Sequence, residues 1–236
     1  QLRPEESGYH KVSSLKQDGK EVQYETVGTI LEVQLAEPIP PGGKTVLEMA
    51  FNSQVPVQIR RSGRDNAEGI SYSMAQWYPK ISEYDYQGWH ANPYIAREFH
   101  GVWGDFDVRI RIDKAYTIGA TGYLQNPEKI GRGYETEDMT VKQPKGDKLT
   151  WHFKAPQVHD FVWAADPDYT HTKRQAKEGP MMHFFYQKTE DNADAWANLP
   201  RIMEEAFAYI NEHFGKYPYE QYSFIQGGDG GMEYPM

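Results

Sequence analysis

Eight residues decide the fold class of this 236-residue chain: Phe106-Asp107-Val108-Arg109-Ile110-Arg111-Ile112-Asp113. Apolar and charged side chains alternate along them with a period of two, which is typical of a strand with one buried and one solvated face. Antiparallel sheets are commonly covered on one side and wet on the other. Three more runs alternate in the same way, at 31–35, 47–51 and 149–154. We therefore expect a mostly β protein with an antiparallel β-sandwich domain.

Two of these runs are close together in the sequence. The residues between them include 38–43, Pro-Ile-Pro-Pro-Gly-Gly, which breaks strand pairing and supplies turn conformations. We therefore expect 31–35 and 47–51 to form a hairpin with a long loop.

The composition excludes several classes of function. The chain has 25 basic and 34 acidic residues, a formal net charge of −9, so no broad phosphate-binding surface and no nucleic-acid partner are expected. It has no cysteine, which rules out disulfides, thiolate zinc sites and iron–sulfur clusters. No uninterrupted apolar run approaches the roughly 18 residues of a membrane span, so none is expected.

The pattern changes after about residue 187. Six apolar residues recur at intervals of three or four and predict an amphipathic helix: Trp196, Leu199, Met203, Phe207, Ile210 and Phe214. Pro200 cannot sit deep in a regular helix, so the helix either begins near Asn198 or is kinked. Gly215 and Pro218 end it. A short strand is expected over 222–226.

These elements predict two domains. Residues 1–187 form an N-terminal β domain, which we expect to lack its first strands. Residues 188–236 begin a second domain that is truncated. A sheet domain, one helix and strands that stop in mid-element indicate a piece of a longer protein.

A glycine pair near the C-terminus directly precedes a methionine and a glutamate: Gly230-Gly231-Met232-Glu233. Without Cβ atoms the glycines let another backbone approach closely, and an edge strand of this kind can accept an extended peptide. The Glu233 carboxylate can pair with the free α-ammonium group of that peptide and so seat its first residue. From these residues alone, a glycine-rich turn with a solvated glutamate is the simpler interpretation.

The order of the motifs favours the first interpretation. The predicted helix ends in Phe214-Gly215-Lys216-Tyr217-Pro218-Tyr219, and the short strand leads to 230–233. This order resembles the aminopeptidase N family of zinc gluzincin metallopeptidases, which carries F-G-x-Y-P-Y and then G-x-M-E-N. The resemblance covers about 72–236, and Tyr234 stands where the family signature has Asn. Further segments resemble a bacterial branch of that family: 76–80, 88–90, 92–94, 104–108 and 120–124.

The resemblance implies a fold and a set of substrate-binding residues. The fold would be a saddle-like antiparallel β-sandwich, followed by the first helix and strands of a thermolysin-like α+β catalytic domain. Gly230 and Gly231 would bind the substrate backbone, with Met232 beside them in the signature, and Glu233 would hold the α-amino group. Gln76 is the candidate for a glutamine at the rim of the first-residue pocket, and a structural Gln capping a loop is the alternative.

The resemblance also implies a metal that this segment does not hold. The family binds zinc through H-E-x-x-H and a later glutamate, and it removes residues from peptide N-termini. No two of the eight histidines here are separated by three residues, so no pair can be presented at i and i+4 on one helix face. We therefore expect no catalytic residue and no metal ligand in this segment, zinc ligands downstream of it, and no activity or zinc in the fragment alone.

The expected partners are a peptide substrate and the missing catalytic and C-terminal domains of the same chain. The bacterial branch favours export or a place in the cell envelope. Two alternatives remain open. An aromatic cluster between Tyr72 and Trp103 is compatible with a non-catalytic carbohydrate- or peptide-binding β-sandwich module. A peptidase-like scaffold with a decayed downstream site is the other.

Overall fold

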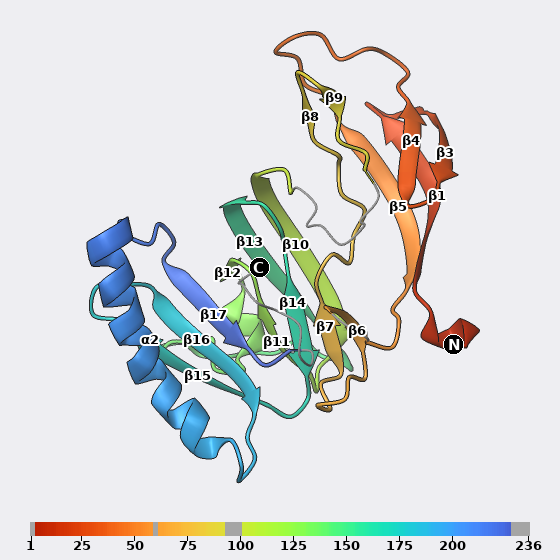
Figure 1. The fold of residues 1–236 in the computed structure, drawn as a ribbon. Coiled ribbons are helices and arrows are strands. Elements are labelled where there is room, and N and C mark those ends of the chain that lie inside the picture. Colours follow the sequence, from red (N-terminus) through yellow and green to blue (C-terminus); the bar gives the residue numbers. More distant parts are fainter. Residues whose placement is uncertain (1–2, 59–60, 93–100, 228–236) are drawn as a thin grey trace. The chain divides into compact units, whose positions relative to one another are not determined.

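The chain folds as two compact units, which span 1–57 with 78–102, and 58–77 with 103–236. The computed structural model describes residues 3–58, 61–92 and 101–227 (Figure 1). The protein is mostly β, as the alternating runs predict. The domain boundary expected at residue 187 stays a prediction.

The first unit is built on antiparallel pairs. Strand β1 (Tyr9–Gln17) lies between β2 (Lys20–Glu21) and β5 (Leu47–Gln54). Two hairpins complete it. One joins β3 (Gln23–Val27) to β4 (Ile30–Gln34), and the other joins β8 (Tyr84–Asp85) to β9 (Gly88–Trp89).

The expected hairpin between 31–35 and 47–51 is wrong. Strand β4 pairs with β3 across the two residues Gly28 and Thr29, and β5 pairs with β1. Gly28 has φ +63°, a conformation that two-residue hairpin turns require. Closing a two-residue turn also costs less chain entropy than closing the long loop that includes 38–43.

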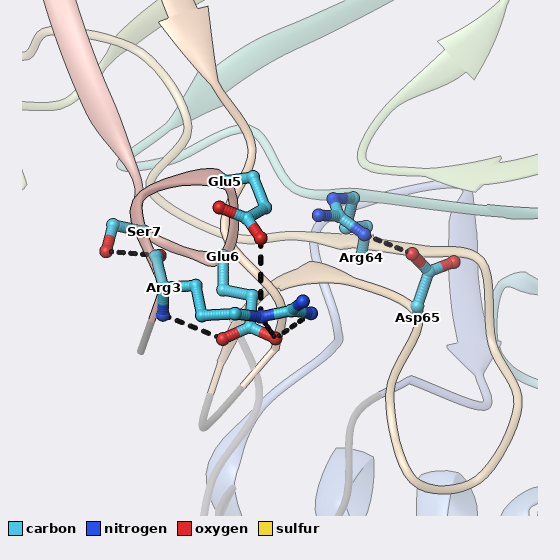
Figure 2. A network of polar contacts seen from close by, with 6 residues as sticks. All are labelled: Arg3, Glu5, Glu6, Ser7, Arg64 and Asp65. Carbon is cyan, nitrogen blue, oxygen red and sulfur yellow. Dashed lines mark hydrogen bonds and ion pairs between the residues drawn. The ribbon is translucent and has the colours of Figure 1, made fainter. Parts of the chain in front are cut away.

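Exposed ion pairs surround the short 3-10 helix η1 (Pro4–Glu6). The Arg3 guanidinium contacts Glu6 at 2.7 Å and Glu5 at 3.3 Å, and Ser7 Oγ donates to the Arg3 carbonyl at 3.2 Å (Figure 2). Such pairs contribute about 0–1 kcal/mol each. The buried apolar residues therefore account for most of the stability.

The described residues of the second unit form three sheets (Figure 1). The first has the order β10 (Gly104–Asp113), β13 (Lys148–Val158), β12 (Tyr123–Leu124). The second has the order β11 (Thr117–Ala120), β14 (Trp163–Asp166), β7 (Tyr72–Met74), β6 (Ser62–Arg64). The third has the order β15 (Tyr169–Gln175), β16 (Met181–Gln187), β17 (Gln221–Ile225).

The main core lies between these sheets. Trp151 and Phe153 of β13 are fully buried, and the alternating apolar residues of β10 pack against the same core. The prediction of a strand over 106–113 with one buried face is confirmed. Phe161, Ile118 and the end of the short helix α1 (Pro127–Ile130) complete the core.

Helix α2 (Ala193–Phe214) covers one face of the third sheet. Its Trp196 ring stacks on Tyr186 of β16 with centroids 4.5 Å apart, and Phe207 is buried against the same sheet. The helix begins at Ala193, earlier than the start near Asn198 that the sequence offered, and it contains Pro200. Within the described ranges, no helix has both the length and the apolar character needed to cross a membrane.

Candidate substrate-positioning site

Four of the five predicted site residues, Gly230 to Glu233, lie outside the described residues. The description ends at Gly227, three positions before Gly230. What the structure provides is therefore the approach to the predicted site: strand β17, a pocket beside it, and the contacts that hold the chain where it leaves that strand.

Strand β17 lies at the edge of its sheet among the described residues. It runs parallel to β16, and the Gln226 amide donates to the Phe185 carbonyl at 2.8 Å. Alternate residues of a strand direct their backbone groups to opposite sides. Gln221, Ser223 and Ile225 therefore direct their N–H and C=O groups away from β16. An edge of this kind can accept an extended chain by main-chain hydrogen bonding.

A pocket of about 660 Å³ opens beside this edge, inside the second unit. Its volume is in the range of small-ligand and peptide side-chain pockets. Aromatic side chains line much of it: Trp103, Tyr123, Trp163, Tyr217, Tyr219 and Tyr222. Burial raises the pKa of the Tyr217 hydroxyl, with a further contribution from the neighbouring tyrosines, so this group stays protonated. The pocket wall is thus mainly aromatic, and Arg61, His159 and Asp160 add polar side chains to it.

Two side chains bind the backbone as it leaves β17. The Tyr169 hydroxyl donates to the carbonyl oxygen of Gln226, and Asn66 Nδ2 donates to the carbonyl oxygen of Gly227 at 3.0 Å. The Gln226 side chain is held as well, because its Oε1 accepts the Gln187 amide hydrogen at 2.8 Å. Three contacts therefore fix two consecutive residues at the end of the described chain.

The buried carboxylate of Asp166 is hydrogen-bonded to Gln187, the residue that holds the Gln226 side chain. Asp166 is 1% exposed, and its Oδ2 accepts from both the amide and the hydroxyl of Ser71 at 2.9 Å. Its Oδ1 accepts from the Asp168 amide at 2.8 Å and from Gln187 Nε2 at 3.0 Å. Four donors satisfy this carboxylate, as a buried charge requires.

Gln76 is the one predicted site residue that the structure describes. It is half-buried, its φ is +52°, and it is not among the described residues that line the pocket. The neighbouring Trp77 Nε1 donates to the Phe161 carbonyl at 3.0 Å, which fixes this part of the loop on the core. Its proposed place at the rim of a first-residue pocket stays a prediction.

The described residues do not fit a zinc site. No cluster of three or more His, Cys, Asp or Glu among them has the geometry to hold a metal ion. The histidines that lie closest together are His171 and His183, and His171 Nε2 is hydrogen-bonded to His183 Nδ1 at 2.9 Å. His171 Nδ1 is bonded to the Arg132 carbonyl at 2.8 Å. The nitrogens that would converge on a metal contact each other instead.

Comparison with known proteins identifies the architecture. No family model and no curated protein matches the chain. Solved structures do match. An M1 zinc metallopeptidase variant from Deinococcus radiodurans, bound to the substrate Tyr-Ser-Ala, aligns over 92% of this chain with a TM-score of 0.57 and 16% identity. The chain has the fold of M1 zinc metallopeptidases. The resemblance stated from the sequence is thereby confirmed at the level of the fold: a mostly β chain with several antiparallel sheets, matching the N-terminal region of M1 zinc metallopeptidases.

Two other solved structures align over a similar share of the chain. Legionella pneumophila aminopeptidase A, in complex with aspartic acid, aligns over 92% of this chain with a TM-score of 0.56 and 13% identity. Yeast LTA4 hydrolase aligns over 94% with a TM-score of 0.51 and 11% identity. The chain covers 46% of the Deinococcus protein, 23% of the Legionella protein and 31% of the yeast protein, so it spans less than half of each.

The sequence does not point to Asn66, Tyr169, Gln187 or Gln226 as part of this site. The Asn66 contact with Gly227 joins residues 161 positions apart, and the Tyr169 contact with Gln226 joins residues 57 positions apart. Neither residue belongs to a motif. The folded second unit brings both side chains to the backbone just after β17.

Proposed function

We propose that this chain is the N-terminal part of a zinc-dependent aminopeptidase and that it positions the substrate. Gly230 and Gly231 bind the peptide backbone, Met232 lies beside them, and Glu233 binds the free α-ammonium group. The observation that carries the proposal is the place of this motif in the sequence, which begins five residues beyond the end of β17, an edge strand among the described residues, in a fold of M1 zinc metallopeptidases. Glu233 thereby restricts cleavage to the first residue of a peptide.

The geometry of the second unit supports this role. The outer edge of β17 and the adjacent pocket are suited to an extended peptide with an apolar side chain. Zinc in the complete enzyme is held by residues downstream of this segment. When bound, it supplies Lewis-acid polarisation of the scissile carbonyl and activation of a water. The residues of this chain contribute binding and orientation, which supply a large share of catalysis by reducing the entropy cost of the reaction.

The test is a pair of variants in the complete enzyme, Glu233→Ala and Glu233→Gln. Both remove the carboxylate that pairs with the substrate amine, and kcat/KM for aminoacyl-p-nitroanilides should fall about 10- to 100-fold, as expected for a charge-assisted hydrogen bond of about 1.5–3 kcal/mol. The exposed Glu212 on α2 provides the matched control, Glu212→Ala. Wild-type kinetics in both Glu233 variants would contradict the proposal.

A second candidate function is a non-catalytic module that binds carbohydrate or peptide. The aromatic pocket favours it, as do the exposed rings of Tyr84, Tyr86 and Trp89 around the β8–β9 hairpin. Calorimetry of the isolated chain against glycans and short peptides separates the two. Saturable glycan binding that Trp89→Ala abolishes would favour the module, and its absence would favour the aminopeptidase.

A further inference from the structure

We propose that the pocket beside β17 binds an aromatic side chain of an extended peptide, while the open edge of β17 binds the backbone of the same peptide. This inference rests on the proposed aminopeptidase function and deepens it by naming a class of substrate, peptides that carry an aromatic residue. Every described residue that lines the pocket belongs to the second unit.

The pocket wall includes main-chain groups that can pair with a ligand. Gln221, Ser223 and Ile225 all line the pocket. Their N–H and C=O groups point away from β16, and in the part of the chain that the structure describes no strand pairs with this edge. An extended peptide can add a strand here by main-chain hydrogen bonding. A ligand without amide groups would leave these donors and acceptors unpaired, so a peptide fits better than a purely apolar molecule.

Aromatic rings on the wall select the side chain of that peptide. The ring centroids of Tyr217 and Tyr219 are 5.5 Å apart, and those of Tyr217 and Tyr222 are 5.6 Å apart. These are distances at which aromatic rings pack on one another, and a further ring is the group that extends such a cluster most favourably. Trp103 and Trp163 line the same pocket. The composition of the wall therefore favours Phe, Tyr or Trp in the ligand over a small side chain.

The charged side chains on the wall favour a ligand group without net charge. Arg61 and Asp160 both line the pocket, and Asp160 is 5% exposed. Their charges are of opposite sign and balance each other, so the pocket offers no net attraction to an acidic or a basic side chain. A neutral aromatic side chain matches this wall, and a lysine or a glutamate does not.

Contacts at both ends of β17 keep the pocket in shape. Before the strand, the Tyr219 hydroxyl donates to the Gln157 carbonyl at 2.5 Å. After the strand, Asn66 Nδ2 donates to the Gly227 carbonyl at 3.0 Å. Tyr219 is the last residue of the motif at 214–219, which thereby gains a physical role. A pocket that is held in this way binds its ligand with a smaller ordering cost.

Trp103 is the pocket residue that a substitution can test without opening the core. It is 62% exposed, and its ring centroid lies 5.4 Å from that of His159, which also lines the pocket. It therefore lies where the pocket opens to solvent. Trp89 is the matched control, because it is also 62% exposed but belongs to the other unit and does not line the pocket.

The experiment measures the binding of two blocked pentapeptides to the complete enzyme by calorimetry: acetyl-Ala-Ala-Phe-Ala-Ala-amide and its all-alanine counterpart. The phenylalanine peptide should bind about 10-fold more tightly, as expected for the burial of a large apolar side chain. Trp103→Ala should remove most of this preference, whereas Trp89→Ala should leave it unchanged. Neither peptide has a free α-ammonium group, so the result does not depend on Glu233.

Methylated forms of the phenylalanine peptide test the backbone pairing. Only alternate amides of a strand face the neighbouring strand. Of two peptides methylated at adjacent backbone nitrogens, one should therefore lose affinity by about 10-fold, because it cannot donate to β17, and the other should retain it. Equal affinities of the two methylated peptides would show that the ligand does not pair with this edge.

Turnover of unblocked peptides links the pocket to the choice of substrate. A peptide that carries the phenylalanine should have a lower KM than its alanine counterpart and a similar kcat, because the pocket binds substrate and transition state alike. Trp103→Ala should remove this difference in KM.

The outcomes separate this inference from the proposed function. Equal affinity for the two blocked peptides, or equal effects of Trp103→Ala and Trp89→Ala, would overturn the inference alone. Binding by residues 1–236 but not by the complete enzyme would also overturn it, because downstream residues would then fill the pocket. Wild-type kinetics in the Glu233 variants would instead contradict the proposed function and would leave the preference for the aromatic peptide unchanged.

Discussion

At the scale of single residues, the His171–His183 pair is a hydrogen-bonded contact that packs against Tyr134 and Phe185 of the main core. His171 Nδ1 faces the Arg132 carbonyl, so it must carry a hydrogen. Its Nε2 then has to accept, and His183 Nδ1 donates to it at 2.9 Å. The pair can take up one proton by a tautomer change in His183. A second proton would place two N–H groups against each other and break the contact.

The pair predicts a pH-dependent stability. Burial lowers the pKa of His171 to about 4 and that of His183 to about 3, with the Lys173 charge acting in the same direction on both and Glu135 opposing it at His171. Both are neutral in the folded protein at pH values where an unfolded chain, with a histidine pKa near 6.5, already binds protons. Stability should therefore be complete above about pH 6.5 and fall between pH 6.5 and 4, by up to about 1.4 kcal/mol per pH unit for each proton.

Urea unfolding of the chain between pH 7.5 and 4.5 measures this slope. His183→Phe should flatten it. Phe184→Leu, at the next position of β16, should lower stability by a similar amount at every pH and leave the slope unchanged, because it removes no titrating group. An equal slope in the parent and in His183→Phe would show that the pair does not titrate in this range.

At the scale of elements, helix α2 carries both buried and exposed apolar side chains, and only the buried ones should contribute strongly to the free energy of unfolding. Phe207 is 4% exposed and packs on the third sheet, whereas Ile202 on the same helix is 48% exposed. Phe207→Ala should lower the free energy of unfolding by about 3–5 kcal/mol, since it leaves a cavity in a packed core. Ile202→Ala should change it by less than about 0.5 kcal/mol. Denaturant unfolding at neutral pH gives both values, and similar losses in the two variants would mean that α2 does not pack as described.

The strands also show what a sequence can predict. Period-two alternation identifies β10, because one face is buried and the other is wet. It says nothing of pairing: the run at 31–35 is a strand, but its partner is β3 rather than β5. Pairing depends on turn geometry and on distant chain segments. The start near Asn198 was wrong for a related reason, because the apolar stripe that includes Trp196 and Phe207 packs on the sheet on both sides of Pro200. The kink that the sequence also allowed stays a prediction.

At the scale of the whole molecule, the fold and the motif order could be predicted from the sequence, whereas the side-chain contacts at the end of β17 could not. Short motifs such as 214–219 lie in one stretch and can be matched directly. The contacts of Asn66 and Tyr169 with the end of β17 exist only after the second and third sheets have assembled. A single sequence carries no signal for them.

In the proposed function, this chain binds the substrate and residues downstream of it bind zinc. The isolated chain should therefore lack both activity and metal. Purified residues 1–236 should show no aminopeptidase activity and hold no stoichiometric zinc, because the proposed zinc ligands lie downstream. Elemental analysis after dialysis, with thermal unfolding to show that the chain is folded, tests this. One tightly held zinc ion per chain would contradict it.

Strand β16 is buried on both faces, and this burial fixes its register in the third sheet. Met182, Phe184 and Tyr186 face α2, while His183 and Phe185 face the opposite layer. A slip of one residue would exchange the two sets and push imidazole nitrogens into the hydrocarbon layer beneath the helix. Burial on both faces therefore favours a single register of β16. Strand β17 pairs with β16, so the register of β17 follows from that of β16, in which a shift by one residue is strongly disfavoured.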